Sequence, residues 1–415
     1  MGLIFKDLIM KRLEFGILRV SNSLKFFMII LLAGLFLLNS SCRKEKKGNN
    51  IFDAEFSKNR DIRLDSLNLE TIELDSVASS HLGFVAINND TIQFIDSKYN
   101  WVFLFDHEGT YIGRELGQGK GPGELPINGI QFYCPVADKG YFFLGSSYDC
   151  HFINKNYERT NSYLVDWNTN VSPKLLQKKP RPKNPRSYNL AYGIGNVRAT
   201  STHVYLPLAP MLPTYSAFNL TTDLYAGKAR TLAKMNIENG KIEKIIGRLS
   251  PLFSENESVR VFSAFKFDII NGNEIAITYL PDPHIYITDL AFQSVKSIFG
   301  YPGKNMDLNY EAIPSTDDNN ELRKYWENQQ NMRGYYNSLE YIEERDMIFR
   351  GYTRGDGSNS KYDGLQIYND QILIADVNVP KTFEVKGYIA PYFYSNAFVD
   401  TKTGKIKIYR FKIEE

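Results

Sequence analysis

The stretch Asp90–Glu124, DTIQFIDSKYNWVFLFDHEGTYIGRELGQGKGPGE, decides the fold. Thr91–Asp96 alternates apolar and polar residues, Trp101–Phe105 is a short apolar run, and Thr110–Leu116 alternates again, so three strands are expected. The turn between the second and third strands is predicted by the Asp-His-Glu-Gly cluster that separates them. A meander of this kind cannot bury both faces of its sheet by itself, and it therefore predicts neighbouring units of the same construction.

The same pattern recurs later in the chain. When Asn273–Gly300 is laid over Asp90–Gly117 without a gap, it repeats the strands, the turn aspartate and the final glycine. A weaker copy, Leu232–Gly247, also ends in glycine. The spacing of the copies gives a unit of roughly 53–65 residues, which fits the chain about six times. The 27 Tyr and 27 Phe residues suit wide sheet faces packed on one another. We therefore expect an all-β fold, a six-bladed β-propeller of four-stranded antiparallel blades.

Both ends of the chain are expected to share the last blade. After the fifth unit only three strands remain at the C-terminus, Thr382–Gly387, Tyr392–Val399 and Lys405–Ile413, whereas a blade needs four. The alternating segment Ile62–Leu74 is the candidate for the missing strand, because closing the ring with it would remove an exposed sheet edge. A short helical insertion is expected near 317–332, where a capping aspartate precedes apolar residues at helical spacing.

The N-terminal segment is not expected to belong to this fold. Basic residues precede Phe26–Leu38, thirteen apolar residues without a charge, which are too short to span ~30 Å of hydrocarbon and are typical of a signal peptide. The following Leu-Asn-Ser-Ser-Cys resembles the lipobox of bacterial lipoproteins, although Asn39 stands where that motif usually has Leu. The resemblance implies that Cys42 carries lipid and that the preceding chain is removed. An ordinary signal peptide with an incidental cysteine is the alternative, and Met10 is a second candidate start.

The chain is thus expected to comprise a signal peptide (1–41), a flexible tether (42–58) and the propeller (59–415). Its formal net charge is +2, and it is close to neutral without the signal peptide, which gives no case for nucleic-acid binding. The remaining cysteines, Cys134 and Cys150, fall on the first and third strands of one meander. Such strands lie about 9–10 Å apart, farther than a disulfide permits, so free thiols are favoured over a bridge.

The glycine-rich loop Gly117–Glu124 carries the candidate site. It is not a phosphate-binding Walker A loop, because Gly121 follows the lysine where Ser or Thr is needed. Its glycines suit a tight crossing between blades, at a face where repeat proteins commonly bind ligands. Backbone N–H groups there can approach an anion, so Lys120 and Glu124 are the candidate ligand or partner contacts. The alternative is that Glu124 caps loop amides and Lys120 is merely solvated.

The sequence contains no recognisable catalytic or metal-binding motif. The five histidines are scattered, without the spacing of a zinc site, and neither a calcium loop nor a G-x-S-x-G nucleophile motif occurs. We expect no metal and no cofactor, and we favour a non-catalytic protein. A hydrolase that uses paired carboxylates from distant blades would leave no sequence spacing and stays open as an alternative.

The turn and the glycine loop together resemble a known group of proteins. The pattern D-x-x-G-x-x-I, formed by Asp106, Gly109 and Ile112, continues into G-x-G-x-G-P-G-E at Gly117–Glu124. Behind a lipoprotein signal, this pattern is similar to the six-bladed, TolB-like β-propeller lipoproteins of Bacteroidetes. The resemblance implies a fold and a location, the outer membrane on its periplasmic side or at the cell surface, rather than an activity.

Taken together, these features predict a membrane-anchored monomer that binds or scaffolds an envelope protein or a glycan without transforming it. The alternative is a glycan hydrolase or lyase with its site at the mouth of the propeller channel. Two or three convergent carboxylates with a Tyr, Arg or His would favour the enzyme, whereas loops plugging an apolar mouth would favour the scaffold.

Overall fold

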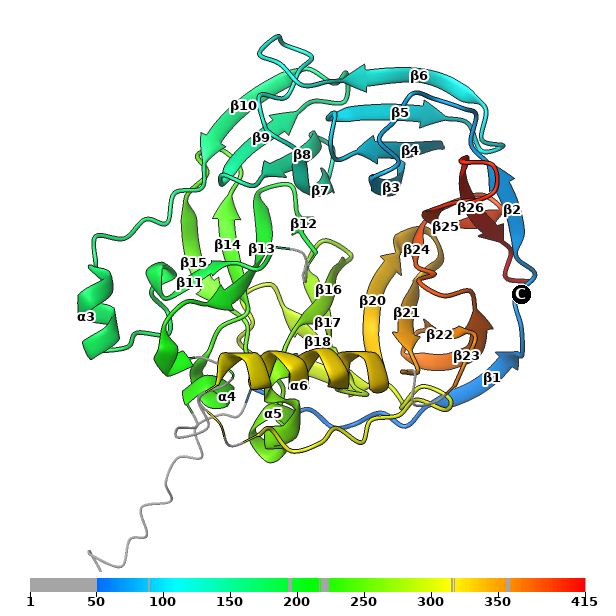
Figure 1. Ribbon diagram of the computed structural model, residues 1–415. Coiled ribbons are helices and arrows are strands. Elements are labelled where there is room, and N and C mark those ends of the chain that lie inside the picture. Colours follow the sequence, from blue (N-terminus) through cyan, green and yellow to red (C-terminus); the bar gives the residue numbers. More distant parts are fainter. Residues whose placement is uncertain are drawn as a thin grey trace, which may run out of the picture. The chain divides into compact units, whose positions relative to one another are not determined.

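A computed structural model of the chain describes residues 51–414 apart from 89, 193–195, 216, 218–223, 315, 317 and 356–358. Within it, Ile51–Glu415 forms one compact unit. Six sheets stand as blades around a central axis in this unit (Figure 1). The expected six-bladed β-propeller is confirmed.

The first two blades are regular four-stranded meanders, each running from an inner strand at the axis to an outer strand at the rim. Blade 1 comprises β3 (Gly83–Asn88), β4 (Thr91–Asp96), β5 (Trp101–Phe105) and β6 (Tyr111–Leu116). Blade 2 comprises β7 (Ile130–Val136), β8 (Gly140–Gly145), β9 (Asp149–Ile153) and β10 (Arg159–Leu164).

The third and fourth blades differ in their inner strands. In blade 3 the inner position is divided between β11 (Tyr188–Leu190) and β12 (Arg198–Ala199), which pair with opposite ends of β13 (His203–Pro210). Its outer strands are β14 (Leu232–Asn236) and β15 (Ile242–Ile246). Blade 4 has one continuous inner strand and comprises β16 (Phe265–Ile270), β17 (Glu274–Tyr279), β18 (Ile285–Asp289) and β19 (Val295–Phe299).

The last two blades contain the N-terminal strands. Blade 5 comprises β20 (Tyr335–Ile342), β21 (Met347–Thr353), β22 (Asp363–Asn369) and β23 (Ile372–Val379), with β1 (Arg60–Leu64) added in parallel to its outer edge. Blade 6 comprises β24 (Val385–Ile389), β25 (Tyr392–Val399), β26 (Ile406–Phe411) and β2 (Glu70–Glu73).

The ring is closed by pairing the two ends of the chain, as expected. Strand β2 lies antiparallel to β26, with Ile72 opposite Ile408, and the two strands are neighbours in Figure 1. The segment Ile62–Leu74 is not one strand, however, because its first residues belong to β1 on blade 5 and only its end closes blade 6. Residues 51–58, expected in the tether, lie against blade 4: the amide of Ser57 donates to the carbonyl of Ile298 at 2.8 Å.

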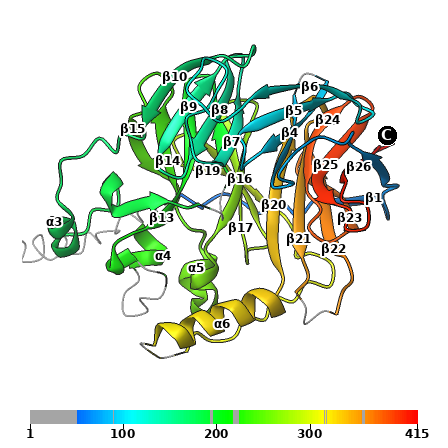
Figure 2. The same ribbon diagram turned by 45° about the horizontal axis from the view of Figure 1, so that its top comes forward.

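Helices occupy the connections rather than the blades. They are α3 (Pro173–Lys178), α4 (Leu224–Lys228), α5 (Leu252–Glu255) and α6 (Asn319–Met332), with 3₁₀ turns at η2 (Pro185–Ser187), η3 (Pro213–Tyr215), η4 (Glu257–Phe262) and η5 (Glu343–Arg345). The predicted helical insertion is α6, which is capped by the Asp318 side chain. Figure 2 shows α4, α5 and α6 on the same face of the propeller. None of the helices in the described part of the chain is long and apolar enough to cross a membrane.

The repeat seen in the sequence corresponds to one recurring hairpin cap. At the end of β5, Asp106 Oδ1 accepts the backbone N–H groups of Glu108 and Thr110, each at 2.9 Å. At the end of β18, Asp289 uses both of its carboxylate oxygens to accept three amides, those of residues 291, 293 and 294. Asn154 and Asn236 occupy the same place in blades 2 and 3 and accept amides through their side-chain oxygens. The repeat therefore marks a turn that needs a side-chain acceptor.

Each blade buries its sheet faces against its neighbours. Between blades 5 and 6, Phe349 contacts Phe393 with tilted rings whose centroids are 5.0 Å apart, and Phe393 stacks on Phe411 at 5.3 Å. All three rings are buried. Edge-on and offset aromatic contacts of this kind add to the stabilisation gained from burial alone, which explains why the chain contains so many Phe and Tyr residues.

Candidate functional site

The inner strands of blades 3 to 6 surround the axis (Figure 1), and six charged residues lie on these strands or directly beside them. In β16, Phe265 and Phe267 pack into the core shared with blade 3. Side chains alternate between the two faces of a strand. Lys266 and Asp268 therefore lie on the opposite face of β16, toward β20. We call the whole group the axial cluster: Arg198 on β12, Lys266 and Asp268 on β16, Glu340 on β20, Glu384 just before β24, and Lys386 on β24.

Arg198 joins three blades through two carboxylates. Its Nε donates to Asp268 Oδ1 at 2.7 Å, and its Nη2 donates to Glu340 Oε2 at 2.7 Å. Although burial opposes it, the two negative charges raise the pKa of Arg198. Asp268 also accepts the backbone N–H groups of Ile269 and Tyr341, each at 2.8 Å. These partners are all donors, as an ionised carboxylate requires.

Glu340 titrates close to neutral pH. Burial and the negative charge of Asp268 together raise the pKa of Glu340 to about 7, although Arg198 and Lys386 oppose them. About a fifth of its side chain, 21%, is exposed, so protons can exchange with solvent. The axial cluster therefore changes its charge within about one pH unit of neutrality.

Lys386 and Lys266 supply the other positive charges. Lys386 Nζ donates to Glu384 Oε2 at 2.6 Å, and although burial opposes it, the pKa of Glu384 is lowered by Lys386, Lys266 and Arg198. Among the described residues, no hydrogen-bond or ion-pair partner is found for the Lys266 ammonium. Burial lowers the pKa of Lys266, and Lys386 and Arg198 lower it as well, although Glu384 opposes them.

This arrangement can hold a charged ligand and can exchange a proton. The carboxylates of Asp268 and Glu340 are neighbours, because one nitrogen of Arg198 contacts both. Sequence reasoning missed the whole cluster, since its members come from four blades and share no spacing. The one local signal is Phe265–Ile270 (FKFDII), where a lysine and an aspartate alternate with phenylalanines.

The predicted site at the glycine loop lies elsewhere. The loop joins the outer strand of blade 1 to the inner strand of blade 2, and the connections that contain α5 and α6 are of the same outer-to-inner kind. Glu124 Oε2 accepts the amide of Gly121 at 2.8 Å, and Arg159 donates to the carbonyls of Lys120 and Glu124 at 2.9 and 3.1 Å. The Lys120 side chain is exposed. The loop is therefore fixed, with Lys120 projecting from it.

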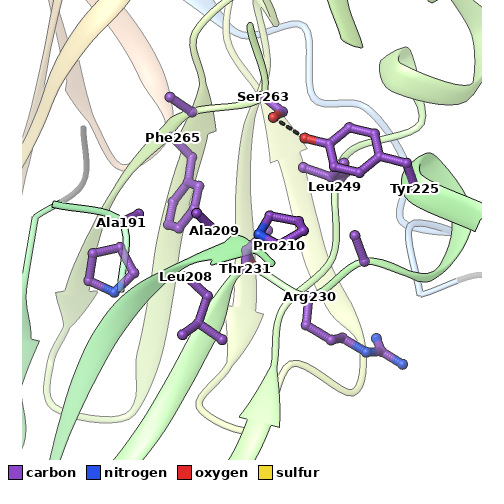
Figure 3. Close-up of a pocket in the computed structure, with 13 residues that line it drawn as sticks. Ala191, Leu208, Ala209, Pro210, Tyr225, Arg230, Thr231, Leu249, Ser263 and Phe265 are labelled. Carbon is purple, nitrogen blue, oxygen red and sulfur yellow. Dashed lines mark hydrogen bonds between the residues drawn. The ribbon is translucent and has the colours of Figure 1, made fainter. Parts of the chain in front are cut away.

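A pocket opens between blades 3 and 4. Its volume is about 460 Å³, open side included, and its wall is mainly apolar, with Phe265, Pro210 and Leu249 around it (Figure 3). The hydroxyl of Tyr225 is hydrogen-bonded to Ser263, while Arg230 points away from these rings in Figure 3. Its described lining residues include no carboxylate, and its polar groups come from Tyr225, Arg230, Thr231 and Ser263.

The cysteines and metal ligands give no second site. Cys42 lies outside the described residues. Cys134 and Cys150 are buried, free thiols on β7 and β9, and burial raises the pKa of each to about 12, which leaves neither as a ready nucleophile at neutral pH. Within the part of the chain that the structure describes, no group of three His, Cys, Asp or Glu residues is placed to hold a metal ion.

The chain matches no protein-family model and no curated protein. Among solved structures, it is similar to a member of the DUF4221 family from Bacteroides vulgatus over 86% of this chain and 100% of that one, with a TM-score of 0.60 at 14% identity. A Bacteroides fragilis protein named as exported is similar over 86% of this chain and 98% of its own, with a TM-score of 0.46 at 11% identity. At such identities the first likeness supports a shared fold, and the second carries no argument.

Proposed function

We propose that this chain is an exported, lipid-anchored propeller that binds an envelope protein or a glycan without transforming it. The observation that carries the proposal is the state of the carboxylates in the axial cluster. Asp268 and Glu340 are both bonded to Arg198, and Glu384 is bonded to Lys386. A carboxylate that attacks a substrate or removes a proton must be free to reach it, whereas carboxylates held in ion pairs form a fixed, charged binding surface.

The anchor is supported by the sequence at the N-terminus. An apolar run of signal-peptide length ends in Cys42, and one lipid chain holds a protein weakly whereas two or more hold it stably. Such an anchor would hold the propeller at the outer membrane, on its periplasmic side or at the cell surface. Metabolic labelling with a fatty-acid analogue tests this directly: wild type is expected to be labelled, and Cys42→Ser is expected to remain unlabelled. Equal labelling of both proteins would contradict the anchor.

Partner capture from solubilised membranes tests the binding function. The full-length chain is expected to enrich a defined protein or glycan, and a variant of the binding surface that keeps the wild-type melting temperature is expected to lose it. Lys120→Ala tests whether the glycine loop binds the partner, and Lys266→Gln tests the axial cluster. The control is Lys244→Gln, which changes an exposed lysine on the outer strand β15. If every variant captures as well as wild type, neither surface is the binding site.

A glycan-processing enzyme is the second candidate, and the axial cluster meets the criterion stated for it: three carboxylates, those of Asp268, Glu340 and Glu384, lie together with Arg198. Asp268 and Glu340 are neighbours, and Glu340 has a pKa of about 7, as a general acid requires. Incubating the full-length chain with envelope polysaccharides and measuring new reducing ends or unsaturated products tests this reading. Activity that disappears in Glu340→Gln would establish the enzyme and displace the binding proposal. Absence of products from the wild-type chain would leave the binding proposal in place.

A further inference from the structure

The connection between blades 2 and 3 concentrates positive charge at the outer edge of the ring, where α3 projects (Figure 1). No Asp or Glu occurs between Asp166 and Asp223, although the whole chain has 49 basic and 47 acidic residues. Six exposed basic side chains stand on α3 or in the loop that follows it. We call them the basic rim: Lys174, Lys178, Lys179, Arg181, Lys183 and Arg186.

The charges of the basic rim are not neutralised by neighbouring carboxylates. Among the residues that the structure describes, no hydrogen-bond or ion-pair partner is found for any of the six side chains. Surface lysines elsewhere differ, since Lys405 and Lys407 on blade 6 both pair with Glu73. The positive charge of the rim is therefore available to an external anion at any pH at which the protein is folded near neutrality.

The loop that carries the basic rim is fixed to blade 3. The hydroxyl of Tyr188 donates to the carbonyl of Pro182 at 2.8 Å and accepts the amide of Arg230 at 3.0 Å. The hydroxyl of Ser187 donates to the carbonyl of Arg181 at 3.0 Å. Binding an external surface would therefore require little ordering of the backbone.

Two exposed apolar side chains stand among these cations. Leu175 on α3 is 40% exposed and Met211 is 42% exposed. The residues next to them, Leu176 and Leu212, share one buried cluster, and the amide of Met211 donates to the carbonyl of Ser187 at 2.9 Å, directly after Arg186. Apolar side chains among Lys and Arg are suited to a membrane interface, where the apolar groups enter the headgroup region and the cations reach the phosphates. A soluble polyanion would use the charges alone.

We infer that the basic rim, with Leu175 and Met211, docks on the surface of a bilayer that contains anionic phospholipids. The inference rests on the proposed membrane location and adds an orientation, with blade 3 toward the bilayer. Ile51, which is hydrogen-bonded to blade 4, follows Cys42 by nine positions, a reach of at most about 30 Å. A lipid on Cys42 would thus keep the rim of the neighbouring blade near the headgroups. Each Lys or Arg at an anionic surface strengthens binding by about five-fold.

Sedimentation with sucrose-loaded vesicles measures this docking without any lipid anchor. The unit Ile51–Glu415, which is compact and contains all six blades, is used so that neither Cys42 nor the apolar run before it contributes. At about 0.1 M salt it is expected to bind vesicles of phosphatidylcholine with about 30% phosphatidylglycerol at least about ten-fold more tightly than vesicles of phosphatidylcholine alone.

Two sets of matched variants separate the contributions. The triple variant Lys178→Gln, Lys179→Gln, Arg181→Gln is expected to lose at least about ten-fold in affinity for the anionic vesicles. The control removes the same charge from exposed lysines of blades 2 and 6, by Lys139→Gln, Lys155→Gln and Lys402→Gln, and is expected to stay within about three-fold of wild type. The pair Leu175→Ser and Met211→Ser is expected to lose at least about three-fold.

Equal binding of wild type to anionic and neutral vesicles would overturn the inference, as would equal losses in the rim and control triple variants. Polygalacturonate tests for an anionic polysaccharide instead of a lipid. If it displaces the protein from vesicles at an equal concentration of charge, and the Leu175→Ser, Met211→Ser protein binds vesicles as well as wild type, the assignment to a bilayer is wrong. Fatty-acid labelling tests Cys42 and this assay contains no Cys42, so the anchor and the docking surface can fail separately.

Discussion

Replacing Glu340 by Gln is expected to stabilise the protein at alkaline pH. The pKa of Glu340 is about 7 in the folded chain, against 4.5 for an unperturbed glutamate. Because the pKa of Glu340 is higher in the folded chain than in the unfolded chain, its bound proton stabilises the fold. This contribution to the free energy of unfolding is fully present below about pH 4.5 and is lost as the pH rises to about 7. The difference between the folded and unfolded pKa values of Glu340 corresponds to a loss of about 3 kcal/mol in the free energy of unfolding at pH 8.

Partial exposure of the side chain, 21%, reduces this figure, and we expect Glu340→Gln to raise the free energy of unfolding by about 1–3 kcal/mol at pH 8. Glutamine has the shape of the protonated acid and keeps an oxygen acceptor for Arg198, so the two proteins should differ by less than about 1 kcal/mol at pH 5. The difference in the free energy of unfolding between Glu340→Gln and wild type should therefore grow as the pH rises from 5 to 8.

Urea unfolding of both proteins at pH 5, 6, 7 and 8 measures this difference, and the control Glu255→Gln, an exposed glutamate in α5, should follow wild type throughout. Parallel pH dependence of wild type and Glu340→Gln would refute the reasoning, because it would mean that Glu340 has the same pKa in the folded and unfolded chains.

Three further predictions concern the fold and the glycine loop. Asp106→Asn should change the free energy of unfolding by less than about 0.5 kcal/mol, because asparagine keeps the one accepting oxygen used at that turn. Asp289→Asn should lower the free energy of unfolding by about 1–3 kcal/mol, because it removes one of the two accepting oxygens used there. Equal costs of the two substitutions in urea unfolding would contradict this. Ile72→Ala, in the buried part of the closing strand, should cost about 2–4 kcal/mol, and a thermal melt matching wild type would argue against closure by β2. Glu124→Ala should cost about 1–3 kcal/mol by leaving a loop amide unpaired, whereas Lys120→Ala should leave the melting temperature unchanged and alter only partner capture.

The strands were predictable because their signal is local. Thr91–Asp96 and Trp101–Phe105 were expected with the boundaries that the structure shows, since the first alternates and the second is a short apolar run before a turn cluster. The segment Ile62–Leu74 was harder to predict, because its apolar and polar residues alternate without a break while its strand pairing changes partway along. Its first part pairs with blade 5 and its last part with blade 6, and nothing in the local pattern says where one partner ends and the next begins.

The axial cluster was not predictable, for a different reason. Arg198 meets Asp268 and Glu340 only because a circular arrangement brings the inner strands of successive blades together. In the sequence these three residues are separated by whole blades, and only Asp268, which follows two phenylalanines in FKFDII, stands in a segment with a local signal. The glycine loop shows the opposite case: its turn chemistry was legible, including the capping contact of Glu124 with Gly121 that was considered as an alternative, because the interacting groups are close in the chain.

Closure by β2 and β26 also sets an order of events for folding. The strand Glu70–Glu73 is synthesised before any blade is complete, and its partner Ile406–Phe411 follows only after the strands of blades 1 to 5. Contacts between such distant segments form slowly, because the entropy of closing the loop is lost before any contact is gained. Blades 1 to 5 can therefore assemble one after another along the emerging chain, while the final sheet must wait for the C-terminus. A chain truncated before Ile406 would leave Glu70–Glu73 without its partner, so the ring would stay open at blade 6.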